Sequence, residues 1–237
     1  MTEITKTAVI AGASGLIGKE LLRVLLHDES YGKIIILVRK MLDVKHLPHS
    51  KHKLEQRVID FAHIEAAVAD CMSGSYVFCT LGTTIKKAGS QEAFRKVDYE
   101  YPLSLGRISA KAGAAQFCIV TAMGASSRSG IFYNKVKGQV EDTLQTAGLQ
   151  SLHIFRPSLL LGEREEKRAG EQIASVIAKA TSFAWIGPLA RYKPIYGKTV
   201  ALAMVASTLE HAPGVHVYPS SAIHNLAKKS VMKSVMK

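Results

Sequence analysis

Short apolar runs alternate with longer segments of helical spacing along most of the chain. The runs, such as "TAVIAG" and "IIILV", are rich in β-branched residues, whereas the segments between them place apolar residues three or four positions apart. Runs of the first kind predict strands and segments of the second kind predict helices. The expected strands are Thr7–Ala11, Ile34–Val38, Arg57–Phe61, Tyr76–Leu81, Phe117–Ala122, Leu152–Arg156 and Val215–Tyr218. The expected helices are Gly18–His27, parts of Ile64–Cys71, Ser90–Ala112, Tyr133–Ala147, Glu171–Lys179 and Val200–His211.

This order of elements predicts an α/β fold. Strands that alternate with helices form a parallel sheet covered on both faces, so we expect a doubly wound, mostly parallel Rossmann sheet. A length of 237 residues fits one such domain. We assign 1–228 to this domain, with a small substrate-binding segment at about 162–195. The basic tail 229–237, in which SVMK occurs twice, is expected to be disordered.

A glycine-rich loop directly follows the first expected strand. The stretch "AGASGLIGKELLRVLL" places glycines at 12, 15 and 18 just before an apolar helix. Glycines at such positions allow a tight turn, a close approach of the backbone to a pyrophosphate, and close packing of the helix on the strand. The free amide groups at the helix start then meet the phosphates. The predicted dinucleotide-binding residues of this loop are Gly12, Ser14, Gly15, Leu16, Ile17 and Gly18.

The end of the second expected strand indicates which dinucleotide binds. An acidic residue there holds the ribose 2′-hydroxyl of NAD, whereas an arginine accommodates the 2′-phosphate of NADP. This strand ends in Arg39 and Lys40, and Asp43 lies too far along to reach the ribose. Two cations suit a phosphate by charge, and an arginine also suits it by bidentate geometry. We therefore expect NADP(H) to be favoured over NAD(H); the alternative is a solvated basic turn.

A tyrosine and a lysine stand four residues apart in "GIFYNKVKGQVEDTL". Tyr133 and Lys137 share one helix face, and a cation beside a phenol favours its ionised form. The pair is therefore a candidate acid/base catalyst. The alternative is an ordinary amphipathic helix, because Val136, Val140 and Leu144 form an apolar stripe beside it.

The glycine loop and the YxxxK pair together resemble the short-chain dehydrogenase/reductase superfamily, in particular its atypical members. The blocks "VFCTLGTTIKKAG", "VDYEY", "GIFYNKVKGQVE", "FRPSLLLGEREEKRAGE" and "AIHNLAKK" are similar to the oxidoreductases related to the Tat-interacting protein. This resemblance covers about residues 8–228. It implies that Tyr133 exchanges a proton with the substrate oxygen and that Lys137 assists it and binds the nicotinamide ribose.

The same resemblance implies a hydroxyl that orients the carbonyl at the end of the fifth strand. Thr121 stands there, followed by Ala122 where the family carries a second serine; Ser126 and Ser127 are weaker substitutes. The resemblance further implies cofactor contacts at Asp60 and Phe61, at Leu81, Gly82 and Thr83, and at Pro157 and Ser158. Asp60 could instead cap the next helix, and Pro157 could simply end a strand.

The composition fits a globular protein with an anionic partner. Hydrophobic residues make up 47% of the chain, charged residues 21%, and the net charge is +12. We identify no base-reading motif, no secretory signal and no apolar run long enough to cross a membrane, so we expect neither nucleic acid nor membrane as a partner. Three cysteines without ligand spacing predict buried thiols and no metal site. We expect a cytoplasmic monomer or homodimer.

The sequence thus predicts an NADP(H)-dependent oxidoreductase that reduces a carbonyl, or acts on the corresponding alcohol, with Tyr133 as acid/base. The alternative is a regulator that binds NADPH as a signal and acts through protein interactions. Substrate identity is expected to reside between Gly162 and Pro194. Candidate contacts for an anionic substrate are Arg164, Arg168 and Arg191, although a charged run of this kind more commonly marks a solvated helix start. Phe183 and Trp185 could cover an apolar substrate or simply pack in the protein.

Overall fold

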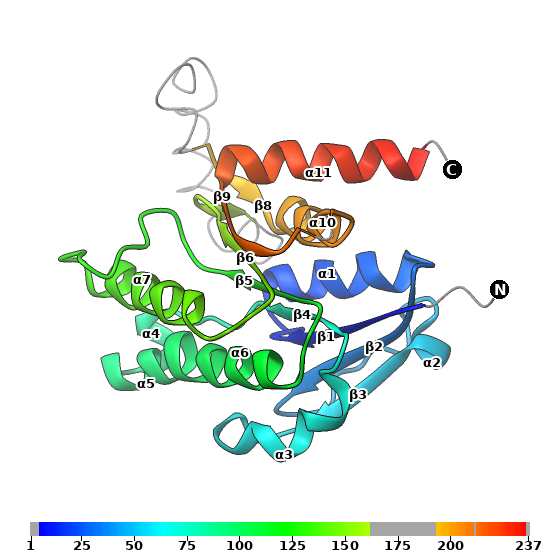
Figure 1. Ribbon diagram of the computed structural model, residues 1–237, viewed down its shortest axis with the longest axis horizontal. Helices are drawn as coiled ribbons and strands as arrows, with labels where there is room; N and C mark the ends of the chain where they lie inside the picture. The colour runs from blue at the N-terminus through cyan, green and yellow to red at the C-terminus, as the bar shows by residue number, and fades with distance from the viewer. Residues whose placement is uncertain (1–4, 162–192, 211, 236–237) are drawn as a thin grey trace.

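The computed structural model describes residues 5–161, 193–210 and 212–235 (Figure 1). Within these residues, seven strands form one sheet in the order β3-β2-β1-β4-β5-β6-β9, and every neighbouring pair is parallel. The expected doubly wound Rossmann sheet is confirmed. The strands are β1 Lys6–Ala11, β2 Tyr31–Val38, β3 Leu54–Val58, β4 Tyr76–Cys79, β5 Gln116–Val120, β6 Ser151–Arg156 and β9 Gly214–Pro219. A separate short pair joins β7 (Leu160–Leu161) to β8 (Ile195–Tyr196).

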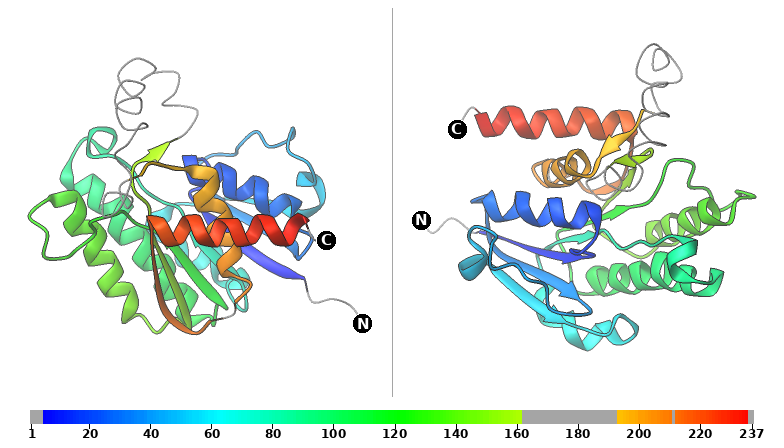
Figure 2. Two further views of the ribbon diagram at one scale, coloured as in Figure 1. Left: turned by 90° about the horizontal axis from the view of Figure 1, so that it is seen from above. Right: turned by 180° about the vertical axis from the view of Figure 1, so that it is seen from behind.

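Helices cover both faces of the sheet. Figure 1 and the right view of Figure 2 place α1, α10 and α11 on one side and α3, α6 and α7 on the other. The described helices are α1 Leu16–His27, α2 Ser50–Lys53, α3 Ile64–Val68, α4 Ile85–Ala88, α5 Gln91–Arg95, α6 Tyr101–Lys111, α7 Phe132–Gln145, α10 Gly197–Ser207 and α11 Ser220–Val235. Single turns of other types are η1 Phe61–His63, η2 Ala69–Cys71 and η3 Lys96–Glu100.

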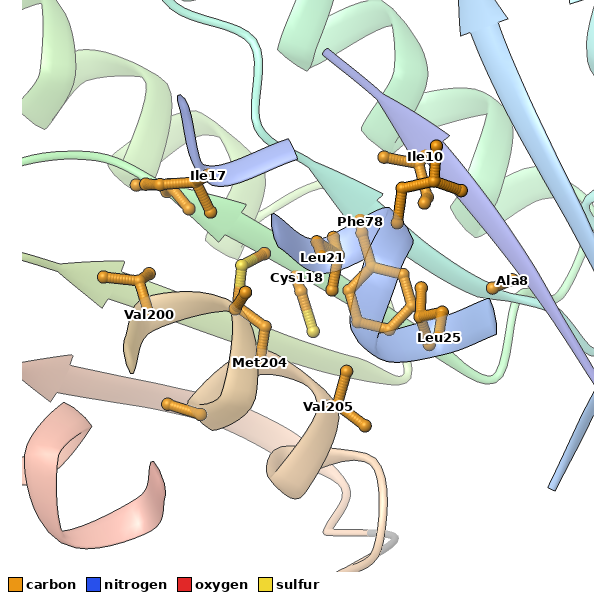
Figure 3. Packing of buried hydrophobic residues seen from close by; sticks show 14 of the residues in the cluster. Ala8, Ile10, Ile17, Leu21, Leu25, Phe78, Cys118, Val200, Met204 and Val205 are labelled. Carbon is orange, nitrogen blue, oxygen red and sulfur yellow. The ribbon is translucent and has the colours of Figure 1, made fainter. Parts of the chain in front are cut away.

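Successive side chains of the central strands point to opposite faces of the sheet, so the hydrophobic core forms two clusters. In β1, Ala8 and Ile10 face α1, α10 and α11, whereas Val9 and Ala11 face α3, α6 and α7. Figure 3 shows the first of these clusters, where side chains of α10 such as Met204 meet Leu21 of α1 near Phe78 of β4. The three cysteines are free and buried, as expected. Because helices cover both faces, a ligand is expected to bind beyond the carboxyl ends of the strands.

The third strand lies earlier in the chain than expected. We predicted Arg57–Phe61, but β3 covers Leu54–Val58 and pairs with β2 from Ile34 to Val38. This strand lies at the edge of the sheet and its side chains are half exposed, so it lacks an apolar signal. The apolar residues that suggested the later position, Ile59 and Phe61, are buried after the strand has ended.

Two further expectations are corrected in the helical parts. The stretch Ser90–Ala112 contains α5, a π-helical turn η3 and α6 in place of one regular helix. The tail from 229, expected to be disordered, continues α11 as far as Val235; it contains no glycine or proline, and lysine and methionine are good helix formers. The helix predicted at Glu171–Lys179 lies outside the described residues.

His153 in β6 makes folding stability sensitive to acid. Its side chain is fully buried; burial first, and then the neighbouring His216, lower its pKa to about 4. Ser151 Oγ donates to the carbonyl of Ala212 and so accepts from Nε2 of His153, while the Tyr218 hydroxyl lies 3.0 Å from Nδ1. These contacts suit a neutral imidazole ring. In the unfolded chain, where a histidine has a pKa near 6.5, the same ring binds a proton in acid.

We therefore expect the free energy of unfolding to fall as the pH drops from 6.5 toward 4. The unfolded chain binds the additional proton in this range, which corresponds to a loss of about 2 kcal/mol between pH 7 and pH 5. Urea unfolding of the wild type and of His153→Gln at these two pH values checks this. The variant should show a smaller loss, whereas His46→Gln, which changes an exposed histidine, should behave as the wild type. Equal losses in all three would contradict the assignment.

Candidate active site

The glycine loop between β1 and α1 has the tight geometry that its sequence predicts. Gly12 has a φ of +93°. A Cβ there would lie 2.7 Å from the backbone of Thr80, which directly follows the neighbouring strand β4. A Cβ on Gly18 would lie 2.1 Å from the Gly12 carbonyl oxygen. Gly15 caps α1 without a side chain, so among the described residues no side-chain oxygen satisfies the first amide groups of the helix. Those amides can bind an anion.

Arg39 and Lys40 follow β2 directly and are both exposed. Among the described residues, neither has a hydrogen-bond or ion-pair partner. Asp43 accepts a hydrogen bond from the Lys45 amide further along the loop. The cationic pair at the end of β2 is thus available to an anionic group, and its binding of a 2′-phosphate stays a prediction.

The tyrosine and lysine of the YxxxK pair lie in the first turns of α7. Tyr133 packs against the buried Phe94 of α5, with ring centroids 5.6 Å apart. Lys137 points into the protein, where its Nζ lies 2.8 Å from Oδ1 of Asp98 in the η3 turn. Burial is the largest single influence and would lower the pKa of Lys137, but the Asp98 carboxylate and the Tyr133 phenol together hold that pKa above its ordinary value. Lys137 is therefore a fixed cation beside Tyr133.

The loop after β4 lies against this ion pair. The Thr83 amide donates to Oδ2 of Asp98 at 2.9 Å. The preceding Gly82 is exposed, and a Cβ there would lie 3.4 Å from Oδ1 of Asp98 and 3.7 Å from Nζ of Lys137. Two of the expected cofactor positions, Gly82 and Thr83, thus adjoin the Tyr133 and Lys137 helix in the folded chain.

Thr121 is turned toward α7. Its hydroxyl donates to Oε1 of Glu141, which also accepts from Nε of Arg156 at 3.1 Å. Thr121 and Glu141 are both buried. A hydroxyl has one proton, so in this arrangement Thr121 does not donate to a substrate carbonyl, and the expected orienting role needs correction. Ser126 and Ser127 lie in the loop that crosses α7 at Gly138, where a Cβ would meet Ser126 at 2.1 Å.

The remaining expected contacts have mostly structural partners. Asp60 accepts from the Ala62 amide and caps η1, while Phe61 is buried against Tyr101. The Ser158 hydroxyl donates to the carbonyl of Lys193 and lies 3.0 Å from the Ser220 hydroxyl. Pro157 is buried beside the β5 end, where its carbonyl accepts from the Met123 amide. Leu81 is half buried at the end of β4.

Sequence reasoning missed three charged residues that the structure joins to this site. Asp98 was seen only as part of "VDYEY", and Glu141 and Arg156 only as parts of longer blocks. The spacing of Lys137 and Glu141 by four could have drawn attention to Glu141, since both share one helix face. Asp98 gave no such signal, because its partner lies on another helix. The expected substrate contacts between 162 and 192 lie outside the described residues.

The sheet order and the glycine loop between β1 and α1 define a Rossmann-type α/β protein. Solved structures agree on the fold. An oxidoreductase of the short-chain dehydrogenase/reductase family from Burkholderia thailandensis matches with a TM-score of 0.68 at 15% identity, covering 92% of each chain. The ADP-L-glycero-D-manno-heptose-6-epimerase of Helicobacter pylori matches with a TM-score of 0.64 at 17% identity, covering 97% of this chain and 85% of its own.

The chain belongs to the HIM1 family, which matches residues 45–186. Protein HTATIP2 of Rattus norvegicus is 30% identical over 95% of this chain and 90% of its own length. The mitochondrial protein FMP52 of Candida albicans is 33% identical over 78% of this chain and 80% of its own. The resemblance to atypical short-chain dehydrogenases related to the Tat-interacting protein is thereby confirmed.

The expected cytoplasmic location is wrong by the same comparison. The FMP52 relatives, from Candida albicans, Scheffersomyces stipitis and Eremothecium gossypii, are named as mitochondrial proteins. The expectation rested on the lack of a secretory signal and of a long apolar run, which does not separate these two compartments.

None of the helices described is both long and apolar enough to cross a membrane. Nor do three or more histidine, cysteine, aspartate or glutamate side chains of the described part of the chain gather into a group that could hold a metal ion.

Proposed function

We propose that this protein is an NADP(H)-dependent oxidoreductase that reduces a carbonyl with Tyr133 as the proton donor. The observation that carries the proposal is the position of the buried cation Lys137 between the two elements that a reductase needs. Its charge interacts with the phenol of Tyr133 on the same helix, and its ion-pair partner Asp98 accepts a hydrogen bond from the Thr83 amide in the loop after β4. The glycine loop also supports a dinucleotide, since Gly15 begins α1 without a side-chain cap and leaves the first helix amides for a phosphate.

The chemistry divides between the cofactor and the chain. A nicotinamide held at the carboxyl ends of the strands, beside the glycine loop, would supply the hydride for the carbonyl carbon. Tyr133 donates its proton to the carbonyl oxygen, so that the carbonyl gains a hydride and a proton and becomes an alcohol. The ammonium of Lys137 stabilises the phenolate left behind until solvent returns a proton. Thr121 supports α7 through Glu141 and takes no part in the proton transfer.

Replacing Arg39 by alanine tests the choice of cofactor. If Arg39 binds the 2′-phosphate, its loss removes charge-assisted hydrogen bonds worth about 1.5–3 kcal/mol, so NADPH affinity should fall by about 10- to 100-fold. NADH affinity should hardly change. Fluorescence titrations with both dinucleotides measure this, and Lys45→Ala, which removes an exposed cation of the same loop, serves as the matched control.

The wild-type titrations separate the proposed function from its alternatives. Tighter binding of NADPH together with turnover of a panel of aldehydes and ketones would support the proposal. Binding of NADPH with no turnover by the panel would favour the alternative of an NADPH sensor. Failure to bind either dinucleotide would refute the proposed function at its first step.

A further inference from the structure

The ion pair between Asp98 and Lys137 is buried more deeply than an ordinary structural salt bridge. The Asp98 side chain is 0% exposed and the Lys137 side chain 5%, with 2.8 Å between the charged atoms. Burying two charges is costly, and such a pair adds little net stability compared with apolar residues of the same shape. Packing alone does not explain why this chain keeps two charges at the centre of its candidate active site.

Asp98 is brought to Lys137 by an irregular backbone. It lies in the π-helical turn η3, between the regular helices α5 and α6. Turns of this type are rare and occur frequently at functional sites. Without the turn, α5 and α6 would be continuous and residue 98 would lie at a different angle around the helix. The turn therefore sets the direction of the Asp98 carboxylate.

The same carboxylate holds a second element. Its Oδ1 contacts Lys137, and its Oδ2 accepts from the amide of Thr83 in the loop after β4. Gly82, which precedes Thr83, is exposed and has no side chain to cover the pair. A single side chain thus joins the lysine on α7 to the loop that borders the proposed cofactor site.

We propose that Asp98 is a positioning residue of the reaction, which keeps Lys137 charged and fixed beside Tyr133 and ties it to the loop at Gly82 and Thr83. This inference rests on the proposed function, because it assigns Asp98 a task in that same site. Asp98 acts through Lys137 and is not expected to touch the substrate.

The negative charge that balances the Lys137 ammonium comes from the carboxylate of Asp98. From β4 it faces the Cys79 thiol, whose pKa burial raises to about 12, so that this thiol is neutral near pH 7. From its own helix it faces the Tyr133 phenol, and from η3 it faces Asp98. Without Asp98, the ammonium would be buried with no anion beside it, and burial favours its neutral form.

The Asp98→Asn variant tests the inference through the pH profile. The amide oxygen of asparagine can still accept from Thr83, whereas the negative charge is lost. We expect kcat at pH 7 to fall at least about 10-fold, with KM for the carbonyl little changed. The remaining rate should decline further as the pH rises, because Lys137 then loses its proton, whereas the wild type should not show this step. Asp142→Asn, which removes an exposed aspartate of α7, is the matched control. A parallel pH profile in Asp98→Asn and the wild type would overturn the inference.

A second readout needs neither substrate nor cofactor. NMR titration of carbon-13-labelled lysine, with Lys137→Met used to assign the signal, follows the charge of Lys137 directly. The signal should titrate at a lower pH in Asp98→Asn than in the wild type; an unchanged titration would overturn the inference. A wild type that binds no dinucleotide would refute the proposed function, while this titration would still decide whether Asp98 maintains the charge.

The Asp98→Glu variant covers the case in which asparagine prevents folding. It keeps the charge but places the carboxylate one methylene further along, so Lys137 should stay charged while kcat falls less than in Asp98→Asn. A glutamate variant with the full wild-type kcat would show that the position of this carboxylate does not matter. A glutamate variant whose lysine is neutral at pH 7 would show that a carboxylate at residue 98 does not maintain the charge. Either result would overturn the inference.

Discussion

Replacing Tyr133 by phenylalanine is expected to reduce kcat for carbonyl reduction by about 100- to 10,000-fold, the range typical for loss of a positioned proton donor. The ring of the variant keeps its packing against Phe94, so the fold should be unaffected. Affinity for NADPH should stay within about 3-fold of the wild type, since the loop and Lys137 are intact. Steady-state kinetics and fluorescence titration measure the two quantities on the same preparation.

Tyr99→Phe provides the matched control for this variant. Tyr99 lies in the η3 turn next to Asp98, and its hydroxyl is 3.3 Å from that of Thr143 on α7. Like Tyr133→Phe, this change removes one phenolic hydroxyl from a tyrosine near α7. Unlike Tyr133, Tyr99 is not part of the candidate site. Its kcat should stay close to that of the wild type. If both variants lost activity equally, or if Tyr133→Phe remained active, Tyr133 would not be the proton donor.

Substituting alanine for Gly18 should have the second large effect, on dinucleotide binding. The new Cβ would lie 2.1 Å from the Gly12 carbonyl oxygen and 2.8 Å from the Ala13 Cα, distances that force the backbone of the loop to shift. The phosphate-binding amides shift with it, so NADPH affinity should fall at least about 10-fold, and overpacking should lower the free energy of unfolding by about 1–3 kcal/mol.

Gly130→Ala is the corresponding control, because a Cβ at Gly130 would have no atom within 4 Å. It should bind and unfold as the wild type does. Fluorescence titration and urea unfolding of both variants check the pair of expectations. Wild-type affinity in Gly18→Ala would show that the dinucleotide does not bind against this loop.

The sequence was informative wherever a feature is local. The turn at Gly12 follows from a strand, a glycine pattern and an apolar helix that are contiguous in the chain. The central strands were found because both of their faces are buried. The edge strand β3 was misplaced because burial, the signal used to find strands, is weakest at an edge. Asp98 was missed because its importance comes from an ion pair across 39 residues of chain, which depends on the packing of α7 against η3.

Thr121 illustrates a different limit. Its residue type and position at the end of β5 were read correctly, but the direction of its proton depends on Glu141 and Arg156, and these residues were not expected to lie there. A hydroxyl can donate in only one direction at a time. Its role therefore follows from its neighbours and not from its place in the sequence.

Helix α7 carries two buried charges one turn apart, and they have opposite sign. Lys137 is bound to Asp98 of η3, and Glu141 is bound to Arg156 of β6. Turning or sliding the helix by one residue would separate both pairs at once and leave charges uncompensated in the interior. The apolar stripe of Val136, Val140 and Leu144 imposes no comparable demand, because apolar contacts are non-directional and can be repacked. Designs that vary this stripe should therefore retain the helix register, whereas designs that remove either pair should lose it.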